Sequence, residues 1–210
     1  MSTRPESRSI PGPVGRLDSR WHGPAEGRPV VLLHPHPLLG GTMGSRLVYD
    51  LAVGLAEDGW RSVRFDFRGA GRSEGDYGEG LGETEDALAV LAAVEAQAGR
   101  TPALIGYSFG GAVACRAAAA RRVDRLVTVA APAQVLGTRL DALADAPRVT
   151  APAHVIVGDR DPYVSVDLAR TMAAAFRPPA GLTVLAAASH FLEPGDNPRV
   201  LAAVRAALAD

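Results

Sequence analysis

Short apolar runs recur along this chain, and most are followed by a longer segment with a different hydrophobic spacing. The short runs are rich in Val, Leu and Ile and mostly lack polar alternation, which is typical of strands covered on both faces. They predict strands at residues 30–33, 62–67, 103–105, 126–129, 153–157 and 182–185.

The longer segments place apolar residues three and four positions apart, which is the spacing of one face of an α-helix. They predict helices at roughly residues 45–57, 83–97, 109–120, 164–176 and 198–208. Strands that alternate with helices form right-handed βαβ units. The chain is therefore predicted to fold as an α/β protein with a doubly wound, mostly parallel sheet.

Residues 1–28 differ from the rest of the chain, because they are rich in Pro, Gly and Arg and show little periodicity. They are interpreted as an N-terminal lead-in that adds a short edge strand or two, near residues 16–21. Residues 29–210 contain no internal repeat and no linker. A chain of 210 residues can bury a full core without disulfides or metals, so one domain is expected over 29–210.

Composition argues against several kinds of partner and location. Lys and Arg total 22 and Asp and Glu total 23, a balance that gives no reason to expect binding to nucleic acid or to a membrane. The one cysteine, Cys115, excludes an internal disulfide and is expected to pack in the core. The N-terminus lacks the apolar stretch of a secretion signal, and no apolar run approaches the ~18 residues of a membrane span. A cytoplasmic protein is therefore expected.

A serine stands between the strand expected at 103–105 and the helix expected from residue 109. The segment reads Gly106-Tyr107-Ser108-Phe109-Gly110-Gly111 and fits the pattern G-x-S-x-G. A sharp turn there lifts the serine clear of the sheet, and the helix N-terminus favours the negative charge that develops in acyl transfer. Ser108 is therefore the candidate nucleophile. The alternative is that Ser108 only caps the helix, as serines often do.

A serine hydroxyl is a poor nucleophile until a positioned base takes its proton. The chain has five histidines, of which His190 follows the last predicted strand and precedes the last predicted helix. Its loop should reach Ser108 at the carboxyl edge of the sheet, so His190 is the candidate base. His22 precedes the core, and His154 lies within a predicted strand, where a packing role is expected.

The acid that orients the base should follow the strand at 153–157, where the chain offers Asp159 and Asp161. Asp161 is preferred, because a residue beyond the tight turn can reach toward the loop of His190. Asp159 is closer to the strand and is expected to stabilise the turn through its own backbone.

Two backbone N–H groups should hold the oxyanion, one after the nucleophile and one from the loop that follows the strand at 30–33. That loop begins His34-Pro35-His36-Pro37-Leu38. Its prolines have no N–H, so the N–H of His36 is expected to pair with that of Phe109, and Leu38 is the alternative. His34 is expected to hold loops together. Two histidines without an evident third ligand do not make a metal site, so no metal is expected.

Five segments now stand in order along the chain. They are the His34-Pro35-His36-Pro37 loop with Gly40 and Gly41, residues 64–75, residues 106–110, residues 158–161 and Ser189-His190-Phe191. Together they resemble the small, lidless bacterial α/β-hydrolases with an HPHP loop, related to the dienelactone hydrolase and acyl-peptidase-like branches. The resemblance covers about residues 25–210. Dienelactone hydrolases use a cysteine nucleophile where this chain has serine.

The resemblance implies the α/β-hydrolase fold and a catalytic triad of Ser108, His190 and Asp161 that cleaves small ester-type acyl substrates through an acyl-enzyme, without a cofactor. Only about twenty residues separate the strands at 126–129 and 153–157, which is too few for a cap domain. A thioesterase or acyltransferase on the same triad, and a non-catalytic binding protein, remain the alternatives. The expected partner is a small-molecule acyl substrate, and edge strands could pair two copies into a homodimer.

The loop after the strand at 62–67 carries Asp66, Arg68 and several glycines. Glycines allow the chain to turn tightly before the next helix. Two interpretations have equal weight: the loop borders the substrate pocket, or Arg68 and Asp66 brace the structure.

Overall fold

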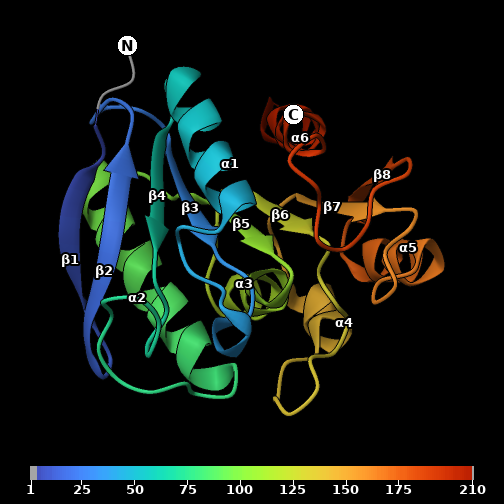
Figure 1. Cartoon of the computed structure of the whole chain (residues 1–210), viewed down its shortest axis with the longest axis horizontal. Helices are drawn as coiled ribbons and strands as arrows, with labels where there is room; N and C mark the ends of the chain where they lie inside the picture. Colours follow the sequence, from blue (N-terminus) through green and yellow to red (C-terminus); the bar gives the residue numbers. More distant parts are fainter. Residues whose placement is uncertain (1–3, 210) are drawn as a thin grey trace.

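The computed structural model describes residues 4–209, and within them a sheet of eight strands runs through the centre of the molecule (Figure 1). The strand order is β1-β2-β4-β3-β5-β6-β7-β8. The strands are β1 (Glu6–Gly12), β2 (Gly15–His22), β3 (Pro29–Leu33), β4 (Arg61–Phe65), β5 (Ala103–Tyr107), β6 (Leu126–Val129), β7 (Ala153–Gly158) and β8 (Gly181–Leu185). Strands β3 to β8 are parallel to one another. Strand β2 pairs antiparallel with β4, and β1 pairs antiparallel with β2. This arrangement confirms the predicted α/β class.

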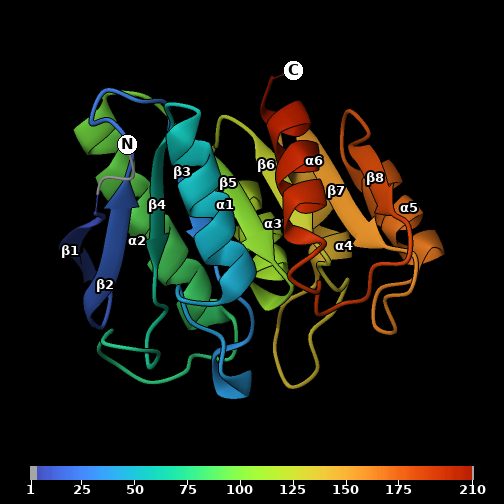
Figure 2. The same ribbon diagram turned by 45° about the horizontal axis from the view of Figure 1, so that its top comes forward.

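Helices cover both faces of this sheet (Figure 2). The helices are α1 (Arg46–Glu57), α2 (Leu81–Ala98), α3 (Phe109–Ala120), α4 (Ala142–Asp145), α5 (Val166–Ala175) and α6 (Asn197–Ala209). Alternate residues of β3 point to opposite sides: Val31 and Leu33 join the core under α2, α3 and α5, and Val30 and Leu32 join the core under α1 and α6. The sheet is therefore doubly wound, as its apolar strands predicted.

The N-terminal segment contributes to the same sheet. The edge strand expected near residues 16–21 lies in β2, and β1, which the sequence pattern did not place, forms a hairpin with it. Leu17 and Trp21 are buried in the core on the side of α2 and α3. Strand β2 then pairs with β4, so the hairpin extends the parallel sheet at one edge.

Strand β4 ends two residues earlier than its predicted range of 62–67. Past Asp66, whose N–H still donates to the carbonyl of Asp18 in β2, the backbone leaves the sheet, because the N–H of Phe67 donates to Nε2 of His34 at 3.0 Å. The carboxylate of Asp66 accepts the N–H of Met43 at 2.7 Å. Both bonds reach loops distant in sequence, so local spacing could not show where the strand stops.

The segment between β6 and β7 forms no cap domain over the sheet. It contains α4 and a short 3₁₀ helix, η2 (Ala146–Arg148), and its buried residues Leu140, Ala142 and Val149 belong to the core under α3. The carboxyl ends of the parallel strands are therefore not covered by a separate cap domain. Among residues 4–209, no helix combines the length and the apolarity needed to cross a bilayer.

Candidate active site

Ser108 occupies the sharp turn between β5 and α3. Its φ of 53° and ψ of −120° lie in a region that side chains other than glycine rarely adopt, and such a residue costs roughly 1–3 kcal/mol. The backbone holds this conformation, because the N–H of Ser108 donates to the carbonyl of Val129 at 2.8 Å. The serine side chain makes no capping bond to the helix, so the capping alternative does not describe it.

The glycines around Ser108 are needed because the turn is crowded. A Cβ on Gly106 would lie 2.2 Å from the carbonyl oxygen of Gly110, and a Cβ on Gly110 would lie 2.5 Å from the carbonyl oxygen of His34. Both distances are far below van der Waals contact. The start of α3 therefore packs directly against β5, which precedes it, and against the end of β3.

The side chains of Ser108, His190 and Asp161 form a continuous hydrogen-bonded chain. Ser108 Oγ lies 2.9 Å from His190 Nε2, and His190 Nδ1 lies 2.8 Å from Asp161 Oδ2. An ionised carboxylate only accepts hydrogen bonds, so Nδ1 carries the proton and Nε2 is left to accept from the serine hydroxyl. The structure thus brings together the three residues that the sequence analysis selected.

Two further contacts fix this arrangement. Oδ1 of Asp161 accepts the backbone N–H groups of Tyr163 at 2.8 Å and Val164 at 2.9 Å, and the carboxylate is fully buried. The hydroxyl of Tyr107 donates to the carbonyl of His190 at 2.9 Å. Both the acid and the loop of the base are therefore anchored independently of each other.

Asp159 was expected to stabilise its own turn, but its carboxylate binds a different loop. Its Oδ1 accepts the N–H of Ala187 at 2.7 Å, across the gap to the loop after β8. Ala187 has a φ of 60°, so this carboxylate holds a residue in the left-handed region three positions before His190. The bond spans 28 residues, which explains why a local turn motif was the wrong interpretation.

The loop after β3 is held by His34. Because the N–H of Phe67 donates to Nε2, the ring proton is on Nδ1, which donates to the carbonyl of Pro35 at 2.7 Å. Burial lowers the pKa of His34 to about 4, so the ring is neutral near pH 7. His34 therefore joins the loops after β3 and β4, which confirms its expected role.

The ring of His36 packs between two other aromatic rings. Its centroid lies 4.7 Å from that of Phe109 and 5.3 Å from that of Tyr77, whose hydroxyl oxygen is 3.2 Å from His36 Nε2. The carbonyl of His36 accepts the N–H groups of Leu39 and Gly41. The side chain of His36 therefore lies beside that of Phe109, the first residue of α3, whose N–H has no acceptor within the helix.

Leu38, the alternative to His36, lies one residue into a short 3₁₀ helix, η1 (Pro37–Leu39), and its side chain is 66 % exposed. Tyr77 was not singled out from the sequence. Its loop, residues 66–80, follows β4 and has no periodic signal that would bring it to His36.

Arg68 braces the loop after β4 by binding a carboxylate of α2. The guanidinium makes bonds of 2.8–3.1 Å to the carboxylate of Asp86 in α2, and the backbone N–H of Arg68 donates to the same group at 2.8 Å. Both side chains are almost completely buried. Asp66 holds Met43, so both residues brace the loop, as one of the two interpretations predicted, and each does so through a partner of its own.

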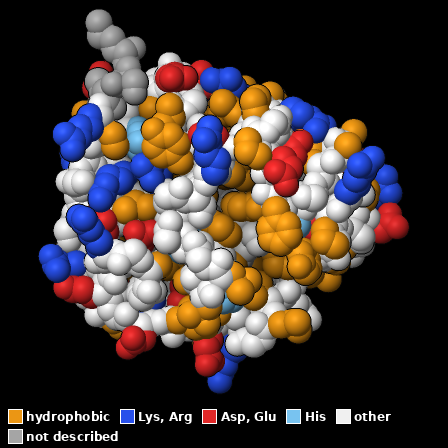
Figure 3. All heavy atoms as spheres, in the orientation of Figure 1, with side chains coloured by type: hydrophobic (Ala, Val, Ile, Leu, Met, Phe, Trp, Pro, Cys, Tyr) orange, Lys and Arg blue, Asp and Glu red, His pale blue; other side chains and the backbone are white. Residues whose placement is uncertain are grey.

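Two exposed aromatic residues border the base. Tyr163 lies two residues after Asp161, and Phe191 follows His190 directly; their ring centroids are 4.9 and 5.6 Å from that of His190. The sequence analysis gave neither residue a role, although their positions next to Asp161 and His190 were a usable signal. Hydrophobic side chains also gather in the central and lower right part of the face seen in Figure 3.

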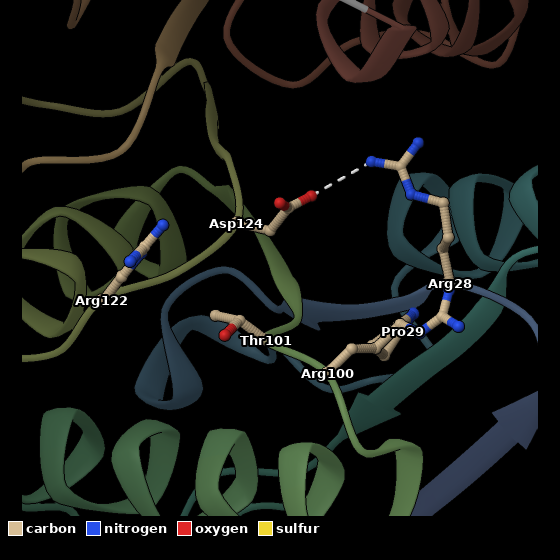
Figure 4. A pocket seen from close by; sticks show the side chains of 6 residues that line it. All are labelled: Arg28, Pro29, Arg100, Thr101, Arg122 and Asp124. Atoms are coloured by element: carbon tan, nitrogen blue, oxygen red, sulfur yellow. Dashed lines mark hydrogen bonds and ion pairs between the residues drawn. The ribbon is translucent and has the colours of Figure 1, made fainter.

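A cavity of about 220 Å³ lies away from these residues (Figure 4). Its lining comes from the amino ends of β3, β5 and β6 and includes Arg28, Arg100, Arg122 and Asp124. Arg28 pairs with Asp124 at 3.1 Å. This cavity lies where the parallel strands begin, and Ser108 lies where β5 ends. The two sites are therefore at opposite ends of the strands. Within residues 4–209, no three His, Cys, Asp or Glu side chains are grouped as a metal site would require.

Comparison with known proteins places this geometry in context. A family model described as the alpha/beta hydrolase fold matches residues 28–150. The chain is similar to an alpha-beta serine hydrolase homologue from Coxiella burnetii, with 31 % identity, 97 % of each chain covered and a TM-score of 0.84. It is equally similar to a serine hydrolase without a lid from Xanthomonas campestris, with 31 % identity, 100 % of this chain and 95 % of that chain covered and a TM-score of 0.84.

A curated relative from Rickettsia prowazekii, an uncharacterized protein, is 31 % identical over 162 residues. The match covers 74 % of this chain and 67 % of the relative.

Proposed function

The chain belongs to the alpha/beta hydrolase fold family, and on that premise we propose that it is a serine hydrolase that cleaves esters of small acyl groups. The observation that carries the proposal is the hydrogen-bonded order Ser108, His190, Asp161, with distances of 2.9 and 2.8 Å. A serine, a base and a buried acid in this order are the groups that nucleophilic acyl transfer needs.

In the first half-reaction, Ser108 Oγ attacks the ester carbonyl carbon and its proton passes to His190 Nε2. The imidazolium that forms is stabilised by the carboxylate of Asp161, which already accepts a bond from Nδ1. When the bond between the carbonyl carbon and the alcohol oxygen breaks, His190 gives the proton to the leaving alcohol. Water then attacks the acyl-serine with His190 as base, and the free acid and Ser108 are regenerated.

The oxyanion of each tetrahedral intermediate is assigned to the backbone N–H groups of Phe109 and His36. Phe109 is the first residue of α3, where the helix dipole favours negative charge. His36 is the residue with an N–H between two prolines, and its ring packs on that of Phe109 at 4.7 Å. Removing one such donor typically costs roughly a hundred- to a thousand-fold in kcat.

Small or protruding esters are the proposed substrates, because the carboxyl edge of the sheet has no cap. In the segment between β6 and β7, the buried residues Leu140, Ala142 and Val149 pack into the core under α3, and the segment forms no cap that could cover a long acyl chain. A long chain that stays in water gains nothing from binding, so activity should not rise with acyl length.

The test is the hydrolysis of p-nitrophenyl esters of increasing acyl length by the purified chain, with Ser108→Ala as the matched control. We expect turnover of the short esters and a loss of at least about a thousand-fold in the variant, at unchanged fold. A thioester with the same acyl group distinguishes a thioesterase. A Ser108→Ala variant that keeps its activity, or a folded wild type that cleaves no ester or thioester, contradicts the proposal.

A further inference from the structure

Exposed apolar side chains concentrate at the edge of the sheet that carries Ser108. Among residues 4–209, eight large hydrophobic side chains are exposed. Five of them stand in loops after the carboxyl ends of β3, β6, β7 and β8: Leu38, Leu39, Leu136, Tyr163 and Phe191. Figure 3 shows hydrophobic side chains gathered in the central and lower right part of the face that it presents. Exposed apolar patches that polar residues border mark binding sites for ligands or other proteins.

Two of the five make direct contact with the base. The rings of Tyr163 and Phe191 meet the imidazole of His190 edge to face, with interplanar angles of 74° and 89°, and they meet each other at 6.2 Å. Edge-to-face contact at these distances is a favourable arrangement of aromatic rings. The two rings are nevertheless 63 % and 68 % exposed, so each keeps a free surface next to His190.

The backbone under both rings is fixed by the site itself. The N–H of Tyr163 donates to Oδ1 of Asp161 at 2.8 Å. Phe191 follows His190, whose carbonyl accepts the hydroxyl of Tyr107 at 2.9 Å. The rings are therefore attached to an ordered framework. A pre-organised exposed ring can bind an apolar group at a smaller entropic cost than a mobile one.

The chemistry decides which part of the substrate lies there. His190 must protonate the oxygen of the leaving alcohol, so that oxygen has to come within about 3 Å of Nε2. The substituent on the oxygen then lies beside the imidazole, within reach of the rings that contact it. The acyl substituent extends from the carbonyl carbon in a different direction. It stays attached to Ser108 through that carbon in the acyl-enzyme.

We propose that Tyr163 and Phe191 bind the alcohol part of the ester, and that the substrates are esters of apolar or aromatic alcohols. The inference rests on the proposed function, because it assigns His190 the role of proton donor to the leaving group. Selectivity should accordingly arise in the acylation step, since deacylation begins from an acyl-enzyme that no longer contains the alcohol.

The experiment compares acetate esters of ethanol and 2-phenylethanol, whose leaving groups have similar intrinsic reactivity. We expect the wild type to favour the phenylethyl ester by about tenfold in kcat/KM, the scale that apolar pocket contacts provide. In the double variant Tyr163→Ala, Phe191→Ala this ratio should fall to about one. The ratio of kcat/KM between the acetate and butyrate esters of ethanol should keep its wild-type value in the double variant, because these two substrates carry the same alcohol.

Leu136→Ala is the matched control, because it removes an exposed apolar side chain from the same edge, in the loop after β6. The alcohol ratio should stay at the wild-type value in this variant. An unchanged ratio in the double variant overturns the inference while leaving ester hydrolysis by Ser108 intact. A double variant that alters only self-association shows that the rings serve a second copy and also overturns it. A wild type that cleaves no ester and reacts with no serine probe overturns the proposed function itself.

Discussion

Replacing Asp161 by asparagine should abolish most of the activity while preserving the fold, because the carboxylate faces three hydrogen-bond donors. Oδ1 accepts two backbone N–H groups, from Tyr163 and Val164, and Oδ2 accepts Nδ1–H of His190. An asparagine has one carbonyl oxygen and one NH₂ group at these two positions. One of the two sides must therefore lose its acceptor.

The number of donors that face each end of the side chain determines which donors lose their acceptor. If the NH₂ group faced Tyr163 and Val164, two buried N–H groups would lose their partner, at a cost of roughly 1–3 kcal/mol each. The amide should therefore turn its NH₂ group toward His190. An NH₂ donor at Nδ1 requires that nitrogen to accept, so the ring proton moves to Nε2. His190 then presents an N–H to Ser108 and cannot take the serine proton.

In serine proteases with the same order of hydrogen bonds, the corresponding change lowers kcat roughly 10⁴-fold. At 1.36 kcal/mol per tenfold, this is about 5.4 kcal/mol of lost transition-state stabilisation. We expect a loss of this size for Asp161→Asn. The free energy of unfolding should fall by no more than about 3 kcal/mol, because the two backbone bonds are kept and one charged bond is lost.

The assay is kcat for p-nitrophenyl acetate near neutral pH, with urea unfolding measured on the same samples. Asp159→Asn is the control, since the exposed Asp159 accepts a single N–H, from Ala187, which an amide oxygen can also accept. The kcat of Asp159→Asn should fall by less than about tenfold. A folded Asp161→Asn variant within tenfold of the wild type would falsify the tautomer argument, and equal losses in both variants would show that this carboxylate has no special role.

Three further predictions follow from contacts near the site. Tyr77→Phe removes the hydroxyl 3.2 Å from His36 Nε2 and should lower kcat by about tenfold with little change in KM, measured by steady-state kinetics; a change in KM alone contradicts the oxyanion assignment. Burial lowers the pKa of His34 from 6.5 to about 4, so between these pH values the unfolded chain binds the extra proton and stability falls as pH falls. In urea titrations, the stability advantage of wild type over His34→Gln should therefore narrow by up to about 1.4 kcal/mol per pH unit below pH 6.5; a constant difference contradicts it. Gly110→Ala should destabilise by at least about 2 kcal/mol, because its Cβ would lie 2.5 Å from a carbonyl oxygen, whereas Gly195→Ala, with open space around it, should change stability by less than about 1 kcal/mol; similar unfolding midpoints for the two contradict the packing argument.

Much of the fold was predictable because the pattern that determines it is local. Strands buried on both faces must be apolar throughout, and the runs at 126–129 and 182–185 were located to within one residue of β6 and β8. The serine turn was equally readable, since the pattern G-x-S-x-G lies within one strand-turn-helix unit, where a Cβ on Gly106 would meet the carbonyl oxygen of Gly110 at 2.2 Å. The contact that requires Gly110 is with His34, in the loop after β3. Local sequence therefore carries both the sheet and the position of Ser108.

The residues that were misjudged depend on contacts across the chain. Asp159 binds Ala187, whereas local reasoning assigned its carboxylate to its own turn. Arg68 braces its loop through Asp86, a partner that the sequence did not indicate. Tyr77 reaches His36 over 41 residues of separation. Contacts between residues this distant depend on how the loops fold at the carboxyl ends of the strands. The spacing of residues in a single sequence does not specify the conformation of those loops.

Covalent labelling tests whether Ser108 is an activated nucleophile. The purified wild type would be incubated with a fluorophosphonate probe, and the adduct located by intact mass and peptide mapping, beside Ser108→Ala. We expect one adduct per chain, on Ser108, and none in the variant. A folded wild type that forms no adduct, or an adduct that survives in Ser108→Ala, contradicts the account.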